Sequence, residues 1–373
     1  MKYIDEFRRK EPVQALLRSI TDCSAGYSAE APMTFMEVCG THTMTIARSG
    51  IRAMLPPSVR LISGPGCPVC VTPNAFIDHA VELARRSDSI ITTFGDMMRV
   101  PGSRSSLSME RASGSDIRVV TSALDALDLA KKNSGRPVVF LGVGFETTAP
   151  TIAASLHMAR QEHISNFFVL SAHKTMPPPM DMLSRGSIAI HGYLCPGHVS
   201  AVIGADAYRF LPEKYGIACV VAGFEPLDIL QSIAMLAKQV RENRPGVEIA
   251  YTRAVTRQGN YAARAMMEKV FDPCDSEWRG LGVIPGSGLA LSPTYAAFDA
   301  GARFSVTVPP PQEHKGCRCG DVLQATIIPS QCGLFGTVCT PASPAGPCMV
   351  STEGTCAAYY KYLRHREAGP LPV

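Results

Sequence analysis

The sequence predicts an α/β fold with two similar Rossmann-like domains, each built on a parallel sheet, and a cysteine-rich segment organised around a metal. Three observations predict this fold. Short apolar runs alternate with helical patterns over the first two thirds of the 373 residues. A glycine-containing strand-to-helix pattern recurs along the chain. The composition changes near residue 305, where Pro, Gly and Cys become frequent.

Seven short runs rich in Val, Ile and Leu each end in Gly or a polar turn and therefore indicate strands. They cover residues 34–38, 59–63, 89–94, 117–120, 137–143, 167–172 and 217–223. Continuous apolar strands that alternate with amphipathic helices are typical of parallel sheets covered on both faces. Ligands gather at the carboxyl ends of such strands, so the turns that follow them are the candidate sites.

The turn pattern repeats within the chain. Residues 61–84 and 139–159 share a strand, a Gly-x-Gly turn, a proline and a helix, and residues 220–236 repeat Gly-Phe-Glu before a helix. We therefore expect two similar α/β domains, at residues 26–120 and 121–244. Residues 1–25 and 245–373 are expected to form the third domain, whose tail shows little periodicity and would fold around a metal.

Composition excludes several classes of protein. The chain is 46% hydrophobic, which is enough for a sizeable core. Its start is charged, and no apolar run approaches the roughly 18 residues that span a bilayer, so we expect a cytoplasmic protein without membrane segments. The 36 basic and 32 acidic residues are mixed, which disfavours nucleic-acid binding. Thirteen cysteines, an odd number, favour metal or redox chemistry over a disulfide framework.

The segment Gly64-Pro65-Gly66-Cys67-Pro68-Val69-Cys70 follows the second predicted strand. Thr72 as N-cap and Pro73 at the first helical position predict a helix running to about Arg85. Cys70 would then lie beside a helix N-terminus, which stabilises a thiolate. Cys67 and Cys70 could form a redox dithiol, half of a metal site, or two buried inert thiols.

Cys39 and His42 lie in Cys-Gly-Thr-His-Thr, at the end of the first predicted strand. Thr41 can cap a helix over residues 41–49, which would also make the Cys39 thiol acidic. His42 could be a metal ligand or a proton carrier, although such a Cys and His pairing is more often incidental.

Other polar groups follow later strands. Glu146 stands in Gly-Phe-Glu-Thr-Thr and could line a cleft or cap a helix. The third glycine of a dinucleotide fingerprint is missing there, and no Walker A sequence occurs. Cys195 and His198 could bind a metal, but a buried cysteine and a turn histidine are the commoner reading. We expect the remaining cysteines before the tail to be structural, namely Cys23, Cys219 and Cys274.

The tail holds six cysteines, at 317, 319, 332, 339, 348 and 356. Zinc sites usually bring ligands in Cys-x(2–4)-Cys pairs, which this tail lacks, and the spacing also misses the ferredoxin runs. Thiolates spread over a Pro/Gly-rich segment are compatible with a [4Fe–4S] cluster. Zinc and buried structural thiols remain the alternatives.

Together these motifs resemble the HypD family of [NiFe]-hydrogenase maturation factors. The resemblance is carried by C-G-T-H-T at 39–43, G-P-G-C-P-V-C at 64–70, G-F-E-T-T-A-P at 144–150, P-G-H-V at 196–199 and the tail cysteines. It runs in order along essentially the whole chain. The tail fits the family's pattern Cys-x14-Cys-x6-Cys-x16-Cys, and by resemblance these residues hold a [4Fe–4S] cluster: Cys317, Cys332, Cys339 and Cys356.

The resemblance implies a redox-active assembly scaffold rather than a stand-alone enzyme. With HypC and HypE, such a scaffold assembles the iron that carries two cyanides and one carbonyl for the hydrogenase large subunit, and HypE supplies the cyanide. Cys39 would bind the iron beside His42, and Cys67 and Cys70 would act at the iron or as a redox dithiol. By the same resemblance Cys319 and Cys348 are not cluster ligands.

Two other functions compete with this interpretation. One is a cluster-dependent disulfide reductase acting through Cys67 and Cys70. The other is a zinc-stabilised binding module. The convergence of Cys39, His42, Cys67 and Cys70 at adjacent strand ends is the structural expectation that the scaffold requires.

Overall fold

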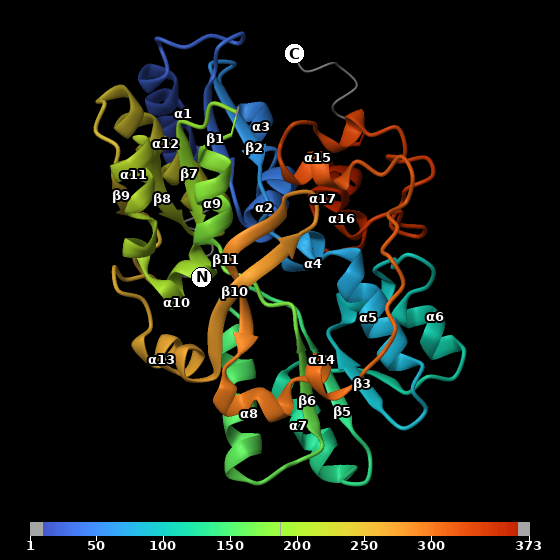
Figure 1. The fold of residues 1–373 in the computed structure, drawn as a ribbon. Coiled ribbons are helices and arrows are strands. Elements are labelled where there is room, and N and C mark those ends of the chain that lie inside the picture. The colour runs from blue at the N-terminus through green and yellow to red at the C-terminus, as the bar shows by residue number, and fades with distance from the viewer. Residues whose placement is uncertain (1–9, 187, 365–373) are drawn as a thin grey trace.

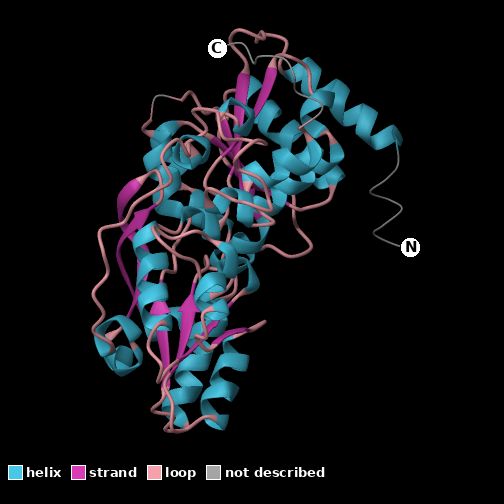
Figure 2. Ribbon diagram, turned by 90° about the vertical axis from the view of Figure 1, so that its right-hand side faces the viewer, coloured by secondary structure: helices cyan, strands magenta, loops and turns pink. Residues whose placement is uncertain are grey.

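Two parallel sheets, one above the other, form the body of the protein (Figure 2). The computed structural model describes residues 10–186 and 188–364. The first sheet has the order β2 (Val59–Ser63), β1 (Met33–Glu37), β7 (Gly192–Pro196), β8 (Ala218–Ala222), β9 (Val247–Ile249). The second has the order β4 (Ile117–Val119), β3 (Ile90–Thr93), β5 (Val138–Gly142), β6 (Phe167–Ser171). The predicted α/β fold with parallel sheets is confirmed.

Helices cover both sheets (Figure 1). Around the first lie α1 (Lys10–Cys23), α2 (Gly40–Ser49), α3 (Ile51–Met54), α9 (Pro177–Ser184), α10 (Gly197–Ile203), α11 (Phe210–Tyr215) and α12 (Pro226–Arg241). Around the second lie α5 (Asn74–Ala84), α6 (Leu107–Ala112), α7 (Ala123–Lys132), α8 (Ala149–Gln161), α13 (Tyr261–Val270) and α14 (Ala300–Arg303). The tail holds α15 (Cys319–Leu323), α16 (Pro347–Val350) and α17 (Thr355–Tyr362), and α4 (Pro68–Val71) lies beside α16.

The seven predicted strands are all present, with ends that differ by no more than two residues. Every residue of β1, β5 and β8 is buried, which explains why their sequences are apolar throughout. The sequence did not predict β7, since its residues stand in a mixed Cys and His cluster that favoured only a buried Cys195 and a turn His198. It also did not predict β9, which is three residues long.

The strands divide between the sheets differently from the predicted boundary at residue 120. The chain leaves the first sheet after β2, builds the whole second sheet from β3 to β6, and returns for β7, β8 and β9. Residues 26–120 and residues 121–244 therefore each supply strands to both sheets. The periodicity of single strands locates them but does not say which strands pair.

The N-terminal helix also packs elsewhere than expected. The sequence grouped residues 1–25 with the cysteine-rich tail. Of these, α1 packs against α12 on the first sheet, where Ile20 enters the core, and residues 1–9 lie outside the described residues. In the part of the chain that the structure describes, no helix is long and apolar enough to cross a membrane.

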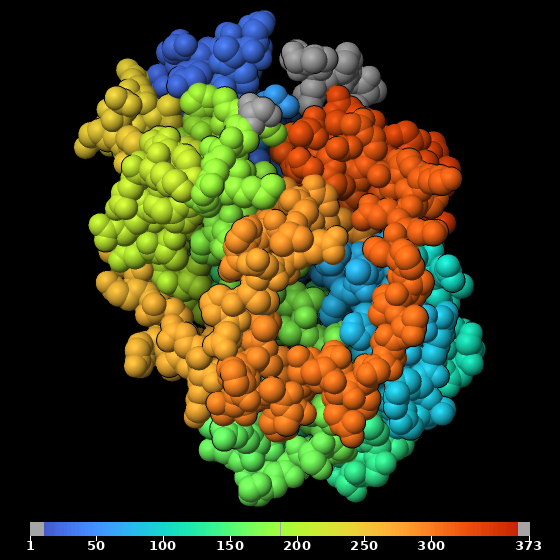
Figure 3. Space-filling model, viewed as in Figure 1, coloured from blue at the N-terminus to red at the C-terminus, as the bar shows by residue number. Residues whose placement is uncertain are grey.

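An antiparallel hairpin, β10 (Phe271–Trp278) and β11 (Gly282–Leu291), crosses between the two sheets (Figure 1). Its tip is held by Trp278, which is fully buried and stacks on Phe145 with ring centroids 5.9 Å apart. The indole Nε1–H donates to Ser287 Oγ at 2.7 Å. From α14 the chain then runs as a strap beside α5 up to the cysteine-rich tail (Figure 3). The backbone carbonyl of Gln312 in this strap accepts a hydrogen bond from Asn74 at 2.8 Å.

The hairpin tip gives a direct test of the packing. Replacing Ser287 with Ala leaves the buried indole N–H without its acceptor, and we expect it to lower the free energy of unfolding by about 1–3 kcal/mol. Trp278 is the one tryptophan of the chain, so urea unfolding followed by its fluorescence reports the change. Ser134→Ala, at an exposed serine, is the control and should leave the unfolding midpoint unchanged. Equal midpoints for both variants would contradict the packing.

Candidate functional site

The carboxyl ends of the first sheet's strands carry the predicted cysteines. From β1 the chain proceeds to β2 on one side of the sheet, whereas β7, β8 and β9 extend on the other side. The crevice of such a sheet opens where these directions diverge, here between β1 and β7. Cys39 follows β1 and His198 follows β7, so both stand at this point of the sheet.

A backbone contact holds the two cysteine motifs together. The N–H of Gly40 donates to the carbonyl of Gly66 at 3.0 Å. A Cβ atom at Gly66 would lie 2.2 Å from the Cys39 nitrogen, so only glycine permits this approach. The turn before Cys67 and the start of α2 therefore lie side by side, as expected for adjacent strand ends.

The helix after the Cys67–Cys70 motif begins differently from the prediction. Cys67 is itself the N-cap of the short helix α4, and its Sγ accepts a hydrogen bond from the Cys70 N–H at 3.2 Å. Thr72 ends α4, and its hydroxyl donates to the Pro68 carbonyl at 2.8 Å. The assignment of Thr72 as the N-cap of the longer helix was wrong, because α5 begins after Pro73 and runs to Ala84.

Neither Cys39 nor Cys70 is the acidic thiol that the sequence predicted. Cys39 does occupy the N-cap of α2, but burial raises the pKa of its thiol to about 12. Cys70 lies in the last turn of α4, where burial and the neighbouring thiols of Cys348 and Cys67 raise its pKa well above the usual value. Loss of hydration outweighs the helix dipole at both positions. A bound metal cation would reverse this balance, since a coordinating thiol is deprotonated.

His42 is fully buried beside this crevice. Burial lowers the pKa of its imidazole to about 4, so the ring is neutral near pH 7. Neither ring nitrogen has a hydrogen-bond partner among the described residues. The ring packs against Phe224 at 5.0 Å, and His198 stacks on the same Phe224 at 3.9 Å. His42 is therefore neutral near pH 7, although the neighbouring backbone groups of Gly223 and Ala222 partly oppose the fall in its pKa.

A loop of the tail reaches the same place. The hydroxyl of Thr41 donates to Glu353 Oε1 at 2.7 Å, and a Cβ atom at Gly40 would lie 2.5 Å from that of Glu353. Two residues earlier, the Ser351 hydroxyl donates at 3.1 Å to Asp96, which lies in the 3-10 helix η2 (Gly95–Arg99) after β3. Sequence reasoning missed Glu353, because its partner Thr41 is 312 positions away and no motif marks it.

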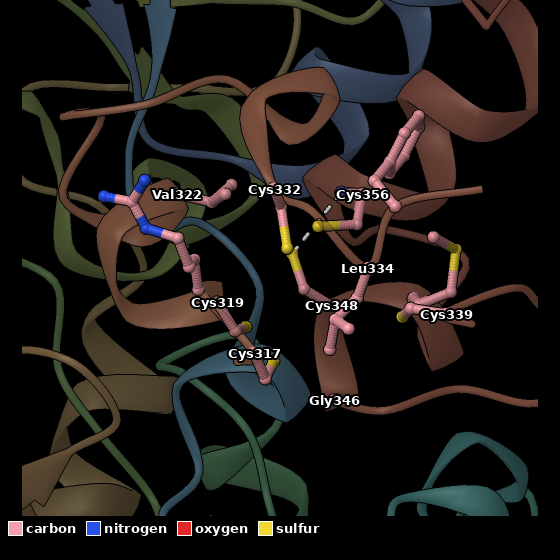
Figure 4. Close-up of a pocket in the computed structure, with 12 residues that line it drawn as sticks. Cys317, Cys319, Val322, Cys332, Leu334, Cys339, Gly346, Cys348 and Cys356 are labelled. Carbon is pink, nitrogen blue, oxygen red and sulfur yellow. Dashed lines mark hydrogen bonds between the residues drawn. The ribbon is translucent and has the colours of Figure 1, made fainter. Parts of the chain in front are cut away.

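One cavity in the tail is lined by all six of its cysteines (Figure 4). The four predicted ligands are among them, and the other lining side chains are largely apolar, including Val322, Leu334, Phe335 and Met349. Within the described ranges, no three His, Cys, Asp or Glu side chains converge on the position of a single metal ion. All thirteen cysteines are free thiols.

Cys348 connects this cavity to the Cys67–Cys70 motif. Its sulfur is within hydrogen-bonding reach of the thiols of Cys319, Cys356 and Cys70, which lower the pKa of the Cys348 thiol well below its usual value. It also accepts a hydrogen bond from the backbone N–H of Cys356 at 3.5 Å (Figure 4). The sequence left Cys348 without a role, and only the packing of α16 on α4 shows where it lies.

Comparison with known proteins identifies the family. The family model described as "HypD: Hydrogenase formation hypA family" matches residues 11–363. The chain belongs to the HypD family. It is 47% identical to hydrogenase maturation factor HypD of Rhizobium leguminosarum bv. viciae over 98% of this chain and 97% of the relative. It is 46% identical to hydrogenase maturation factor HypD2 of Bradyrhizobium diazoefficiens, over 98% of both chains. It is also 46% identical to the Escherichia coli HypD protein, over 97% of this chain and 98% of the relative.

The HypD motif that contains Glu146 belongs to the second sheet. Glu146 follows β5, and its Oε1 accepts a hydrogen bond from the Met176 N–H at 2.9 Å. Burial raises the pKa of its carboxyl to about 7, and its Oε2 has no partner in the part that the structure describes. Among the described residues, no hydrogen bond or ion pair joins Glu146 to Cys39 or Cys67. Its catalytic role stays a prediction.

Cys195 lies inside β7 rather than in a turn, with its thiol against that of Cys219 on β8. Both side chains are fully buried, which agrees with the structural role expected for them. His198 differs from the expected turn histidine, because its stacking on Phe224 brings it to the crevice beside His42. The P-G-H-V motif alone gave no sign of this contact.

The buried histidine of the second sheet gives a prediction about pH. Burial lowers the pKa of His173 to about 3, against 6.5 for the free side chain. Between these values only the unfolded state binds the proton, so His173 reduces stability as pH falls below about 6.5. At pH 5.0 this loss is about 2 kcal/mol relative to pH 7.5. Urea unfolding at both pH values should show a smaller loss for His173→Asn than for the parent.

His163→Asn is the matched control for this measurement. His163 is exposed and has a positive φ of 56°, which asparagine tolerates. This variant should keep the pH dependence of the parent. An equally steep loss of stability in His173→Asn would show that His173 does not cause it.

Proposed function

We propose that this chain, whose family acts in hydrogenase maturation, is a redox-active scaffold on which an iron ion acquires two cyanides and one carbonyl. HypC would share the iron, HypE would supply the cyanide, and the hydrogenase large subunit would finally receive the assembled group. The observation that carries the proposal is that Cys39, Cys67 and Cys70 lie at adjacent strand ends, and that Cys70 contacts a cysteine of the tail cavity.

Cys39 is the proposed thiolate for the iron. Soft thiolate ligands suit iron that carries carbonyl and cyanide. The backbone N–H of His42 lowers the pKa of the Cys39 thiol and so opposes the effect of burial. A bound cation would lower this pKa further and leave the thiol deprotonated. His42, three residues after Cys39, offers a buried neutral imidazole as second donor or proton carrier. The backbone contact with Gly66 keeps Cys67 close to the same point.

The proposed resident cofactor is a [4Fe–4S] cluster held by Cys317, Cys332, Cys339 and Cys356. When bound, such a cluster supplies or accepts single electrons. The cavity fits this group because its donors are all thiols and its other lining is largely apolar. In a four-iron cluster each thiolate binds a different iron, so the sulfurs surround a volume and need not converge on one point. A mononuclear zinc site would require that convergence.

Cys67 and Cys70 are the proposed dithiol between these two sites. Oxidation of their two thiols to one disulfide releases two electrons and two protons. The contact between Cys70 and Cys348 gives the dithiol a short path to the cavity. Cys70 is fully buried and Cys67 nearly so, which favours reduction of a small bound group over reduction of another protein's disulfide. Thirteen free thiols also suit a reducing compartment such as the cytoplasm.

Anaerobic co-purification with HypC in a maturation-competent background tests the proposal. The parent protein should be brown and should show infrared bands of bound cyanide and carbonyl. A colourless protein with bound zinc would favour the binding module. Cluster absorption without those bands, together with turnover of a protein disulfide, would favour the reductase.

Replacing Cys39 with Ala should reduce the iron–cyanide bands at least tenfold, because the iron loses its thiolate. The visible absorption of the cluster should stay at the parent level, since Cys39 does not line the tail cavity. Cys23→Ala, at the end of α1, is the matched control and should keep both signals. Surviving cyanide bands in Cys39→Ala would remove Cys39 as the iron ligand.

Replacing Cys332 with Ser should bleach the visible cluster absorption and lower the thermal unfolding midpoint. The reason is that metal binding in a segment with little core of its own contributes folding free energy. Absorption spectra and thermal unfolding of the anaerobic protein measure both effects. Cys274→Ser, on the hairpin, should change neither. An unaltered spectrum in Cys332→Ser would contradict the ligand assignment.

A further inference from the structure

Arg279 at the tip of the hairpin is the one arginine among the described residues whose side chain lies wholly inside a junction of three segments. Only 4% of the residue is exposed. Its backbone N–H donates to the Val71 carbonyl at 2.9 Å, and its Nε donates to the Thr72 carbonyl at 3.1 Å. Its Nη1 donates to Glu313 Oε1 at 3.0 Å, and its Nη2 donates to Asn74 Oδ1. The guanidinium thus joins the hairpin to the chain that follows Cys70 and to the strap.

The charge of this group is not fully cancelled inside the protein. Burying a charge is costly unless it is paired and hydrogen-bonded. Arg279 is hydrogen-bonded on every side, but its acidic partner Glu313 is about half exposed (49% of the side chain) and so shares its carboxylate with solvent. Arginine keeps its charge in proteins. The guanidinium therefore projects a net positive field into its buried surroundings.

The hairpin tip that carries Arg279 also packs against the tail cavity. Gly280, the next residue, lies so close to α15 that a Cβ atom there would be 2.3 Å from the Gly320 Cα. Gly320 directly follows Cys319, which lines the cavity together with Cys317. The residue after Arg279 therefore packs against the segment that carries Cys317 and Cys319.

We propose that Arg279 is a positioning residue of the cavity, which fixes the backbone after Cys70 against the hairpin and the strap and raises the reduction potential of the centre that the cavity holds. The inference rests on the proposed cluster. Reduction adds one electron and therefore one negative charge, with no bond formed or broken. A fixed positive charge nearby stabilises that state relative to the oxidised one.

The test is a redox titration of the cluster in the anaerobically purified full chain, followed by visible absorption and electron paramagnetic resonance. Arg279→Met should lower the ratio of reduced to oxidised cluster at a fixed potential on the order of tenfold, which for a one-electron couple is about 59 mV. Arg279→Lys, which keeps the charge, should stay close to the parent. Glu313→Gln, which removes the partly compensating negative charge, should shift the potential upward.

Arg111→Met is the matched control, because Arg111 is exposed on α6 and should leave the potential unchanged. Equal shifts in Arg279→Met and Arg279→Lys would mean that only the hydrogen bonds matter, and would overturn the inference. If Arg279→Met does not fold, Glu313→Gln decides alone: an upward shift supports the charge effect, and an unchanged or lower potential overturns it. A parent chain without cluster absorption would overturn the proposed function itself, whereas unmoved potentials in a loaded protein overturn this inference only.

Discussion

The close approach of Gly66 to the backbone of Cys39 and Gly40 is the contact on which the rest of the site depends. It requires glycine, since any side chain would collide with the neighbouring backbone. It places α2 beside α4, and α4 in turn packs against α16 of the tail. Three segments that are distant in the sequence are thereby joined: the Cys39 motif, the Cys67–Cys70 motif and the cysteine cavity. The parallel sheet supplies the geometry, because it delivers the ends of β1 and β2 to the same edge.

Burial is the second constraint, and it explains the chemistry that the site can perform. The thiols of Cys39 and Cys70 lie in a desolvated interior where the neutral form is favoured. Such protonated thiols are poor nucleophiles toward dissolved substrates, but they become strong ligands when a metal cation binds and removes their protons. The buried, neutral imidazole of His42 fits the same requirement. The site is therefore better suited to holding a metal away from water than to attacking a soluble substrate.

The sequence predicted local structure and family well. Seven strands were found because buried parallel strands are apolar throughout, and long motifs such as C-G-T-H-T and G-P-G-C-P-V-C identified the HypD family. Pairing between strands was not predictable, because periodicity does not encode partners. The return of the chain to the first sheet at β7 and the antiparallel hairpin were therefore missed. The predicted acidity of Cys39 and Cys70 failed because a sequence shows a helix start but not the burial that opposes it.

The same limit applies to contacts made across the fold. Glu353 and Cys348 lie in a segment whose sequence is typical of a loop. Their partners are far away in the sequence: Thr41 lies 312 positions before Glu353, and Cys70 lies near the other end of the chain from Cys348. Arg279 looks like an ordinary polar residue in a hairpin turn. Only the folded chain shows the partners of these three side chains.

Electron exchange between the Cys67–Cys70 dithiol and the tail cavity can be followed in a single sample. The anaerobic, cluster-loaded protein with Cys67 and Cys70 oxidised is treated with a one-electron donor too large to enter the buried motif. The free thiols of both cysteines are then counted by alkylation and mass spectrometry after unfolding. We expect the disulfide to be reduced to two thiols after the cluster absorption bleaches. A bleached cluster beside a disulfide that stays oxidised would contradict it.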